Sequence, residues 1–183
     1  MVDFLKIART RKTTYEFLTK KVDEGHIIKI MEAGRWAPSC SNSQPWHFIV
    51  VKDKERIKKM IDSASYGAFH TDPPLLIVFV LDSECWETSD HRCIKNDKLG
   101  TMEAYLCIAM PALSMVFEAT SLGIQSCILT PEQNISSKIL KLNKGDQVPI
   151  MIGLGYEKPG SFQKKRTRKE LKDLTSYEYF GRS

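Results

Sequence analysis

The segment Thr101–Ser121 limits the possible folds of this chain most, because it is long and reads as one helix that is apolar on most of its faces. A helix that is apolar all round has to be buried on all sides. A chain of 183 residues is long enough for one domain with a real core. In a domain this small, we expect part of the helix surface to meet a second subunit.

Short apolar runs rich in β-branched residues alternate with helical patterns along the rest of the chain. This order indicates an α/β or α+β fold with a central sheet covered on both faces, in a single domain over residues 1–183. The polar segment Asp82–Lys98 is predicted to be an irregular loop or lid, and residues 158–183 a basic C-terminal arm with three aromatic residues near its end. The expected strands are Trp46–Val51, Leu75–Leu81, Ile124–Leu129 and Val148–Leu154. Four further helices are expected: Phe4–Arg9, a helix capped by Asp23 that ends before Pro38, a helix from Asp53 to about Ala64, and Pro131–Leu142 with Asn134 as its cap.

Composition narrows the class of protein further. The chain is 42% hydrophobic and 27% charged, which is typical of a soluble globular protein. The longest apolar run, Tyr105–Phe117, is shorter than the roughly 20 residues that cross a bilayer. With no signal-peptide pattern at the N-terminus, we expect a cytoplasmic protein without membrane contact. The five cysteines form no C-x-x-C pair and indicate reduced thiols; Cys85, His91 and Cys93 match no zinc spacing, so we expect no metal.

The ten residues Ala37–Trp46 read A-P-S-C-S-N-S-Q-P-W and form a proline-bounded polar loop. Proline at each end stiffens the chain and removes a backbone donor. Between the prolines lie neutral donors and acceptors, which suit the edge of a polar heterocycle. From composition alone, an ordinary Ser/Asn-rich connection between a helix and a strand is an equally good interpretation.

Two basic clusters lie near the two ends of the chain, whose net charge is +5. Arg9 and the run Arg11–Thr14 combine guanidinium, hydroxyl and turn amide groups, the donors that a phosphate needs. In Lys164–Lys169, alternation puts Arg166 and Arg168 on one side of an extended chain, where they could complete a phosphate site. A solvated surface is the alternative for either cluster, and nucleic acid is a minor one, because no helix-turn-helix pattern or interleaved aromatic residue accompanies them.

Several common catalytic motifs do not fit. Gly153 and Gly155 follow a strand, but Lys158 stands at the third glycine position and no helix follows, which argues against a Rossmann site. The chain has no phosphate-binding P-loop and no G-x-S-x-G elbow, and its four histidines are scattered. If the protein is an enzyme, we expect a cofactor to carry the chemistry.

Four motifs in order resemble the nitroreductase family of FMN-dependent oxidoreductases. They are R-K-T at Arg11–Thr13, the block A-P-S-C-S-N-S-Q-P-W-H-F from Ala37, S-L-G-I-Q-S from Ser121, and the late R-T-R at Arg166–Arg168. The resemblance covers nearly the whole chain. It implies an α+β sandwich with a central, mainly antiparallel sheet flanked by helices, in an intertwined homodimer with two FMN at the interface.

The resemblance also implies where the cofactor contacts lie. One protomer would hold the FMN phosphate, ribityl chain and ring through two groups of residues, while the partner's proline-bounded loop approaches the flavin from the other side. Tyr15 stands where the family usually has Arg or Lys, and glycine or glutamate is common in the family near Thr130 and Pro131. The first group is Arg11, Lys12, Thr13, Tyr15, Arg166 and Arg168; the second is Ile128, Leu129 and Thr130; the loop residues are Pro38, Ser39, Cys40 and Asn42.

The function implied is an enzyme that passes two electrons from NAD(P)H through flavin N5 to a nitroaromatic, a quinone or a similar acceptor, in a ping-pong cycle. No side chain is assigned as catalytic, because the flavin does the chemistry. One alternative keeps the fold but uses the flavin for a specialised reaction, such as dehalogenation or flavin breakdown. The other is a nucleic-acid-binding protein that uses the basic run near Arg166 and Arg168.

Overall fold

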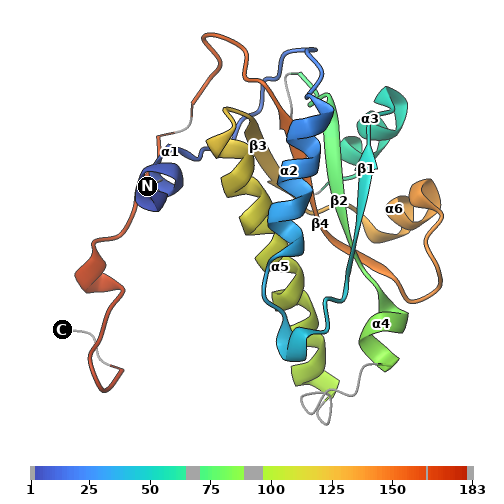
Figure 1. Ribbon diagram of the computed structural model, residues 1–183, viewed down its shortest axis with the longest axis vertical. Coiled ribbons are helices and arrows are strands. Elements are labelled where there is room, and N and C mark those ends of the chain that lie inside the picture. The colour runs from blue at the N-terminus through green and yellow to red at the C-terminus, as the bar shows by residue number, and fades with distance from the viewer. Residues whose placement is uncertain (1–2, 65–70, 89–96, 164, 181–183) are drawn as a thin grey trace.

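A four-stranded antiparallel sheet forms the centre of the computed structural model, which describes residues 3–64, 71–88, 97–163 and 165–180 (Figure 1). The strands lie in the order β1-β2-β4-β3. They are β1, Trp46–Val51; β2, Leu75–Leu81; β3, Gln125–Leu129; and β4, Gln147–Gly155. All four expected strands are present, and the prediction of an antiparallel α+β sheet is confirmed. The prediction of a buried strand at 46–51 is only partly correct, because β1 lies at the sheet edge and most of its residues are half-buried.

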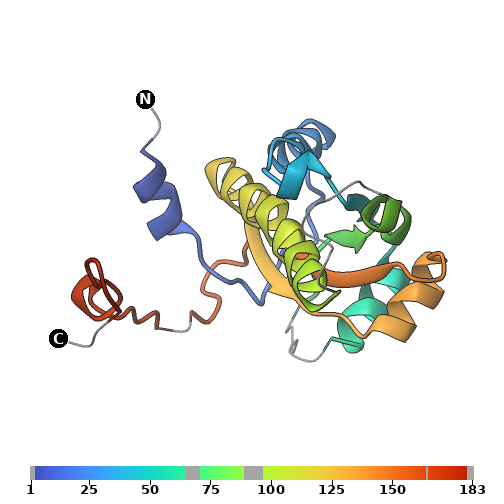
Figure 2. The ribbon, with the colours of Figure 1, turned by 90° about the horizontal axis from the view of Figure 1, so that it is seen from below.

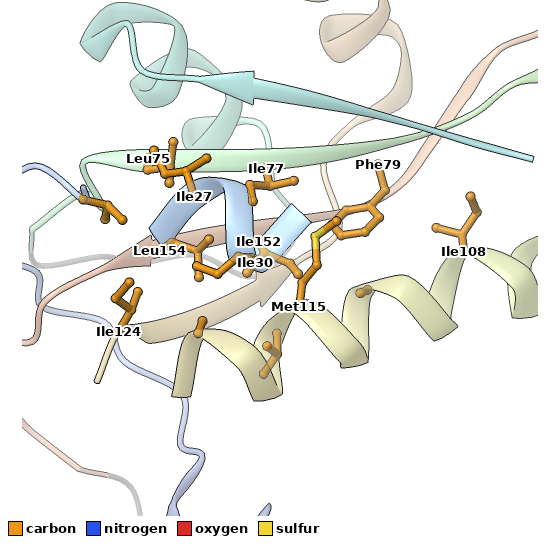
Figure 3. Packing of buried hydrophobic residues seen from close by; sticks show 14 of the residues in the cluster. Ile27, Ile30, Leu75, Ile77, Phe79, Ile108, Met115, Ile124, Ile152 and Leu154 are labelled. Carbon is orange, nitrogen blue, oxygen red and sulfur yellow. The ribbon is translucent and has the colours of Figure 1, made fainter. Parts of the chain in front are cut away.

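Alternation along β2 builds a separate core on each face of the sheet. Leu75, Ile77 and Phe79 face one cluster, together with apolar residues of α2 (Glu24–Arg35) and α5 (Asp97–Ser121) (Figure 3). Leu76, Val78 and Val80 face the other cluster, with residues of α3 (Lys54–Asp62) and, at its margin, α6 (Gln133–Leu140). Helices therefore cover both faces, which explains why every residue of β2 is buried (Figure 2).

Capping carboxylates fix the starts of the helices. The Asp23 side chain accepts the Gly25 N–H at 2.8 Å and begins α2, as the sequence predicts. In α6 the capping residue is Glu132, whose carboxylate accepts the Ile135 N–H at 2.6 Å, so the prediction of Asn134 as the cap is wrong. A Cβ atom at Gly34 would lie 2.2 Å from Met115 Cε, which shows how closely α2 approaches α5.

Helix α5 passes through Pro111 as one continuous helix. By length and composition, its residues Met102–Ser121 are long and apolar enough to cross a membrane, which the sequence reading did not allow. Half of that window is buried inside the protein, and a core helix passes the same test of length and composition. Ile108, Met115 and Val116 are fully buried against the sheet and α2.

The segment 82–98, predicted to be irregular, contains helix α4, Ser83–Thr88, and the first residues of α5. The Asp82 carboxylate accepts the Cys85 N–H at 3.0 Å and so satisfies a donor at the start of α4. The prediction of an irregular loop over residues 82–98 is therefore wrong at both ends of that segment. Residues 89–96 lie outside the described part of the chain, and so do His91 and Cys93, which were considered with Cys85 as metal ligands from the sequence.

Both ends of the chain stand off from the sheet (Figures 1 and 2). The short helix α1, Phe4–Thr10, meets α5 through an edge-to-face contact of Phe4 and Phe117, with ring centroids 5.0 Å apart. Among its described residues, the C-terminal arm has one turn of 3-10 helix, η3, Leu171–Asp173. Its large apolar side chains remain exposed: Leu171, Leu174, Tyr177, Tyr179 and Phe180.

Candidate functional site

The segment that carries Arg11, Lys12 and Thr13 lies beside strand β3. Thr13 forms an isolated parallel bridge with Ser126, and the Thr14 N–H donates to the Ser126 carbonyl at 3.1 Å. Side chains alternate in such an extended segment, so Lys12 and Thr14 point to one side and Arg11 and Thr13 to the other. The sheet thereby fixes which of these groups face a ligand together.

Three guanidinium groups from the two ends of the chain gather at this segment. Arg166 donates to the backbone carbonyl of Arg9 at 2.7 Å and to that of Arg11, although 155 residues separate Arg166 from Arg11. Burial, followed by the charges of Arg166 and Arg168, lowers the pKa of Arg11 below its ordinary value. Among the described residues, none of the three forms an ion pair with a carboxylate. This cationic cluster, Arg11, Arg166 and Arg168, is therefore suited to bind an anion.

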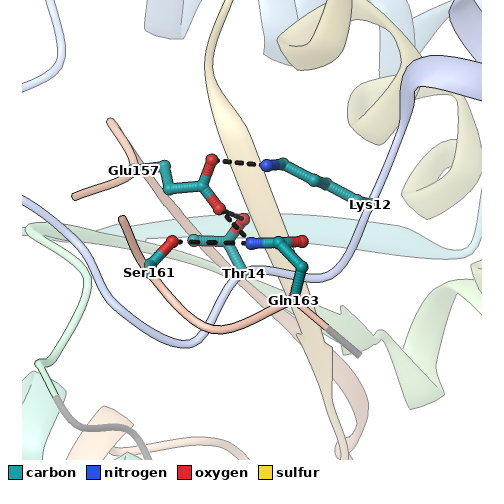
Figure 4. Close-up of polar contacts among 5 residues, drawn as sticks. All are labelled: Lys12, Thr14, Glu157, Ser161 and Gln163. Carbon is teal, nitrogen blue, oxygen red and sulfur yellow. Dashed lines mark hydrogen bonds and ion pairs between the residues drawn. The ribbon is translucent and has the colours of Figure 1, made fainter. Parts of the chain in front are cut away.

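Lys12 pairs with Glu157, two residues after the end of β4 (Figure 4). Its Nζ lies 2.5 Å from Glu157 Oε2, while Thr14 Oγ1 donates to Oε1 at 3.3 Å and the Gln163 amide donates to the same oxygen. Burial alone would raise the pKa of Glu157, but hydrogen bonds from Lys12, Ser161 and Thr14 and the charge of Lys12 hold it below its ordinary value. Lys12 thus points away from the cationic cluster.

The far end of β3 presents the three residues predicted to lie beside a ring. Ile128 is 44% exposed and Thr130 is exposed, so both have surface available to a ligand. The Leu129 side chain is buried in the second core, which leaves only its backbone for such a contact. Tyr15 packs half-buried against the same core.

The proline-bounded loop has an unusual backbone that side-chain contacts hold in place. Ser41, Asn42 and Gln44 all have positive φ, at 49°, 56° and 51°, a region that residues other than glycine seldom occupy. The Ser39 hydroxyl accepts the Gln44 N–H at 2.9 Å, and Cys107 Sγ accepts the Cys40 N–H at 3.3 Å. Strained backbone of this kind is concentrated at ligand-binding sites.

A cavity of about 220 Å³ opens between this loop and helix α5. Its walls are mostly apolar, with the Glu103 carboxylate 3.8 Å from the Cys40 thiol. Its lining residues are Pro38, Ser39, Cys40, Glu103, Leu106, Cys107 and Met110.

Within one protomer the loop and the helix that leads into the cationic cluster contact α5 at different points along its length. The loop contacts α5 at Cys107, whereas α1, which leads into Arg11, contacts it at Phe117. Ten helical residues correspond to roughly 15 Å. Figure 1 shows the same separation, with the loop below and α1 and the start of β3 above. One chain thus unites Arg11, Thr13, Arg166 and Arg168 near β3 but does not bring Pro38–Asn42 to them.

An apolar surface on α5 begins beside the loop and extends along the helix toward α1. It consists of Met102, Leu106, Met110 and Leu113, which are 62%, 57%, 44% and 49% exposed. Spacings of four, four and three residues place them on one side of the helix. A continuous apolar surface of this kind usually marks an interaction site.

Comparison with known proteins shows to which protein family the chain belongs. The sequence pattern of the nitroreductase family matches residues 8–156, and the chain therefore belongs to the nitroreductase family. A provisionally named NADH dehydrogenase/NAD(P)H nitroreductase of Archaeoglobus fulgidus is 37% identical over 82 residues, 45% of this chain and 47% of that protein. An NADH dehydrogenase of Thermus thermophilus is 32% identical over 85 residues, 46% of this chain and 41% of that protein. In these alignments the chain spans about half the length of its curated relatives, or less.

The solved structures agree on the fold. A nitroreductase family protein of Clostridium difficile superposes with a TM-score of 0.80 at 23% identity, covering 98% of this chain and all of that one (100%). The Streptococcus pneumoniae member superposes with a TM-score of 0.82 at 20% identity, covering 96% and 100%. At these identities the likeness shows the fold alone, and it confirms the predicted nitroreductase-like sandwich.

Sequence reasoning missed Glu157, Glu103 and Cys107. Glu157 follows a strand in an otherwise basic stretch, where no local pattern marks it as a partner of Lys12, 145 residues earlier. Cys107 is one apolar residue among many in α5, and only the folded loop shows that its sulfur meets the Cys40 amide.

Proposed function

We propose that this protein is an FMN-dependent oxidoreductase that passes two electrons from NAD(P)H to an organic acceptor. The observation that carries the proposal is the cationic cluster, in which three guanidinium groups from the two ends of the chain meet beside the start of β3 without a carboxylate partner among the described residues. Holding like charges together is unfavourable unless an anion joins them. A phosphate monoester supplies two negative charges and several acceptors.

The residues present fit FMN in three ways. Arg11, Arg166 and Arg168 would bind the phosphate, and Thr13, on the same side of its segment as Arg11, would donate a hydroxyl to the phosphate or the ribityl chain. The exposed surface of Ile128 and the backbone up to Thr130 would lie against the ring and its edge. The proline-bounded loop offers neutral donors and acceptors around Ser39 and Asn42, which suit the uncharged edge of a flavin.

When bound, FMN supplies the hydride and electron chemistry, so the chain needs no acid, base or nucleophile of its own. Its residues bind the phosphate, orient the ring and leave one face open to a donor and then an acceptor. The names of the relatives from Archaeoglobus fulgidus and Thermus thermophilus support NAD(P)H as the donor. A nitroaromatic or a quinone would be the acceptor.

A homodimer completes the proposed site. Within one chain the loop contacts α5 roughly 15 Å from the place where α1, the helix that leads into the cationic cluster, contacts it, so in our proposal the loop would come from a second copy. The apolar surface of Met102, Leu106, Met110 and Leu113 begins beside the loop, runs along α5 toward α1, and would form the contact. The C-terminal arm, which stands off from its own core with exposed Tyr177 and Phe180, would wrap the partner.

The test is cofactor uptake by the purified chain. We expect a yellow protein, or a colourless apoprotein that becomes yellow with FMN, and a much weaker affinity for riboflavin, which lacks the phosphate. The loaded protein should then oxidise NADH or NADPH in the presence of a quinone. A protein that takes up no FMN, or binds riboflavin equally well, would overturn the proposal.

A further inference from the structure

Glu157 has an unusual environment, because it is a mostly buried carboxylate next to the segment that carries Arg11 of the cationic cluster. Its side chain is 20% exposed, and besides the Ser161 hydroxyl it is held by three further groups: Lys12, Thr14 and Gln163. Two of these belong to the segment that carries Arg11, and the third belongs to the start of the arm that carries Arg166 (Figure 4). One carboxylate therefore joins the two segments that form the cationic cluster.

The backbone around Glu157 is fixed before the arm begins. Glu157 forms an isolated antiparallel bridge with Phe17, and the Lys158 N–H donates to the Glu16 carbonyl at 3.0 Å. The chain then turns, with the Ser161 N–H donating to the Lys158 carbonyl at 3.2 Å. Gln163 reaches back to the Glu157 carboxylate, so the arm leaves the core in one direction, toward the carbonyls of Arg9 and Arg11 that Arg166 contacts.

The contacts of Glu157 with Lys12 and Thr14 affect which side chains of the 11–14 segment can face an anion, because side chains alternate along this segment. The bridge to β3 sets the alternation, and Glu157 holds Lys12 and Thr14 on one side, which leaves Arg11 and Thr13 on the other. The charge of Arg166 acts on the Arg11 guanidinium there. Glu157 also offsets the charge of Lys12, which would otherwise add a fourth cation to three that already repel one another.

We propose that Glu157 is the positioning residue of the anion site: it ties the 11–14 segment to the C-terminal arm and so keeps Arg11 and Arg166 together for the phosphate. This inference rests on the proposed function, because the anion it serves is the FMN phosphate. Glu157 itself does not touch the ligand. Its effect on binding is transmitted through Lys12, Thr14 and Gln163.

The test compares FMN with riboflavin in the full-length apoprotein, by quenching of flavin fluorescence. Glu157→Gln keeps the size of the side chain but removes the charge that holds Lys12. We expect FMN to bind roughly tenfold more weakly and riboflavin to bind as before, because only the phosphate contacts change. Glu170→Gln, in the exposed part of the arm, also removes one negative charge and should leave both affinities unchanged.

The outcomes separate the two proposals. Equal binding of FMN and riboflavin by the wild-type protein overturns the proposed function and this inference with it. A wild-type preference for FMN that survives in Glu157→Gln, or becomes stronger because Lys12 is released to the phosphate, overturns the inference alone. If Glu157→Gln does not fold, Gln163→Leu removes only the hydrogen bond between Glu157 and the arm. We then expect the same selective loss of affinity for FMN. A preference for FMN over riboflavin that is unchanged in Gln163→Leu overturns the inference.

Discussion

Replacing Leu113 by aspartate should dissociate the proposed dimer. Leu113 is 49% exposed on α5, so a partner would cover about half of its surface, worth about 1 kcal/mol of the 1.5–3 kcal/mol for a fully buried leucine. A carboxylate left there without a partner costs a further ~1–3 kcal/mol. An isologous interface contains the change twice, which gives about 4–8 kcal/mol, or roughly three to six powers of ten in the dissociation constant.

Sedimentation velocity at micromolar concentration measures this effect directly. The wild-type chain should sediment as a dimer and Leu113→Asp as a folded monomer. Ile135→Asp is the matched control, because Ile135 is 42% exposed but lies on α6, on the opposite face of the sheet, and this variant should remain a dimer. A wild-type monomer, or a Leu113→Asp variant that dimerises as tightly as the wild type, would refute the reasoning.

Three further predictions concern stability. Burial raises the pKa of the Cys127 thiol to about 12 from its ordinary value of 9.0, so the folded protein keeps a proton that the unfolded chain loses. Stability should therefore fall by about 1.4 kcal/mol per pH unit from about pH 9 to 12 because of this group, and urea titrations of Cys127→Ala should show a flatter slope. Gly155→Ala should destabilise the protein by about 1–3 kcal/mol in urea, because the added Cβ would lie 2.6 Å from Pro74 Cδ and 2.9 Å from Phe17 Cδ1, two side chains with little freedom to move. Glu132→Ala should lower the melting temperature more than Asn134→Ala, because Glu132 caps α6; an equal loss would contradict the cap assignment.

The parts of the fold that the sequence predicted are those set by local chemistry. Strand β2 is recognisable because seven consecutive apolar residues between breakers suit only a strand buried on both faces. Helix α2 is recognisable because Asp23 precedes a clear helical period. Helix α4 has no apolar period, and its start depends on an Asp82 carboxylate that could equally belong to a loop.

The candidate site is likewise predictable only where local sequence determines it. The two arginine segments and the proline-bounded loop stand out by composition, and the structure brings Arg11 and Arg166 together. What composition cannot supply is direction: Lys12 belongs to the same basic run as Arg11, yet it points the opposite way and pairs with Glu157. That pairing depends on a contact between β4 and the segment beside β3, which no local pattern encodes.

A mixed dimer tests the central claim most directly, namely that each flavin site takes its arginines from one chain and its loop from the other. One chain carries Arg11→Met and the other carries Asn42→Trp, which blocks the loop; each variant alone should bind no FMN. If the sites are shared, one site of the mixed dimer combines the Arg11→Met change of the first chain with the blocked loop of the second and cannot bind FMN. The other site combines the native arginines of the second chain with the native loop of the first and remains intact. We therefore predict about half of the wild-type FMN content per chain. A mixed dimer without FMN would contradict the account, because it would mean that the arginines and the loop of a single chain form each site.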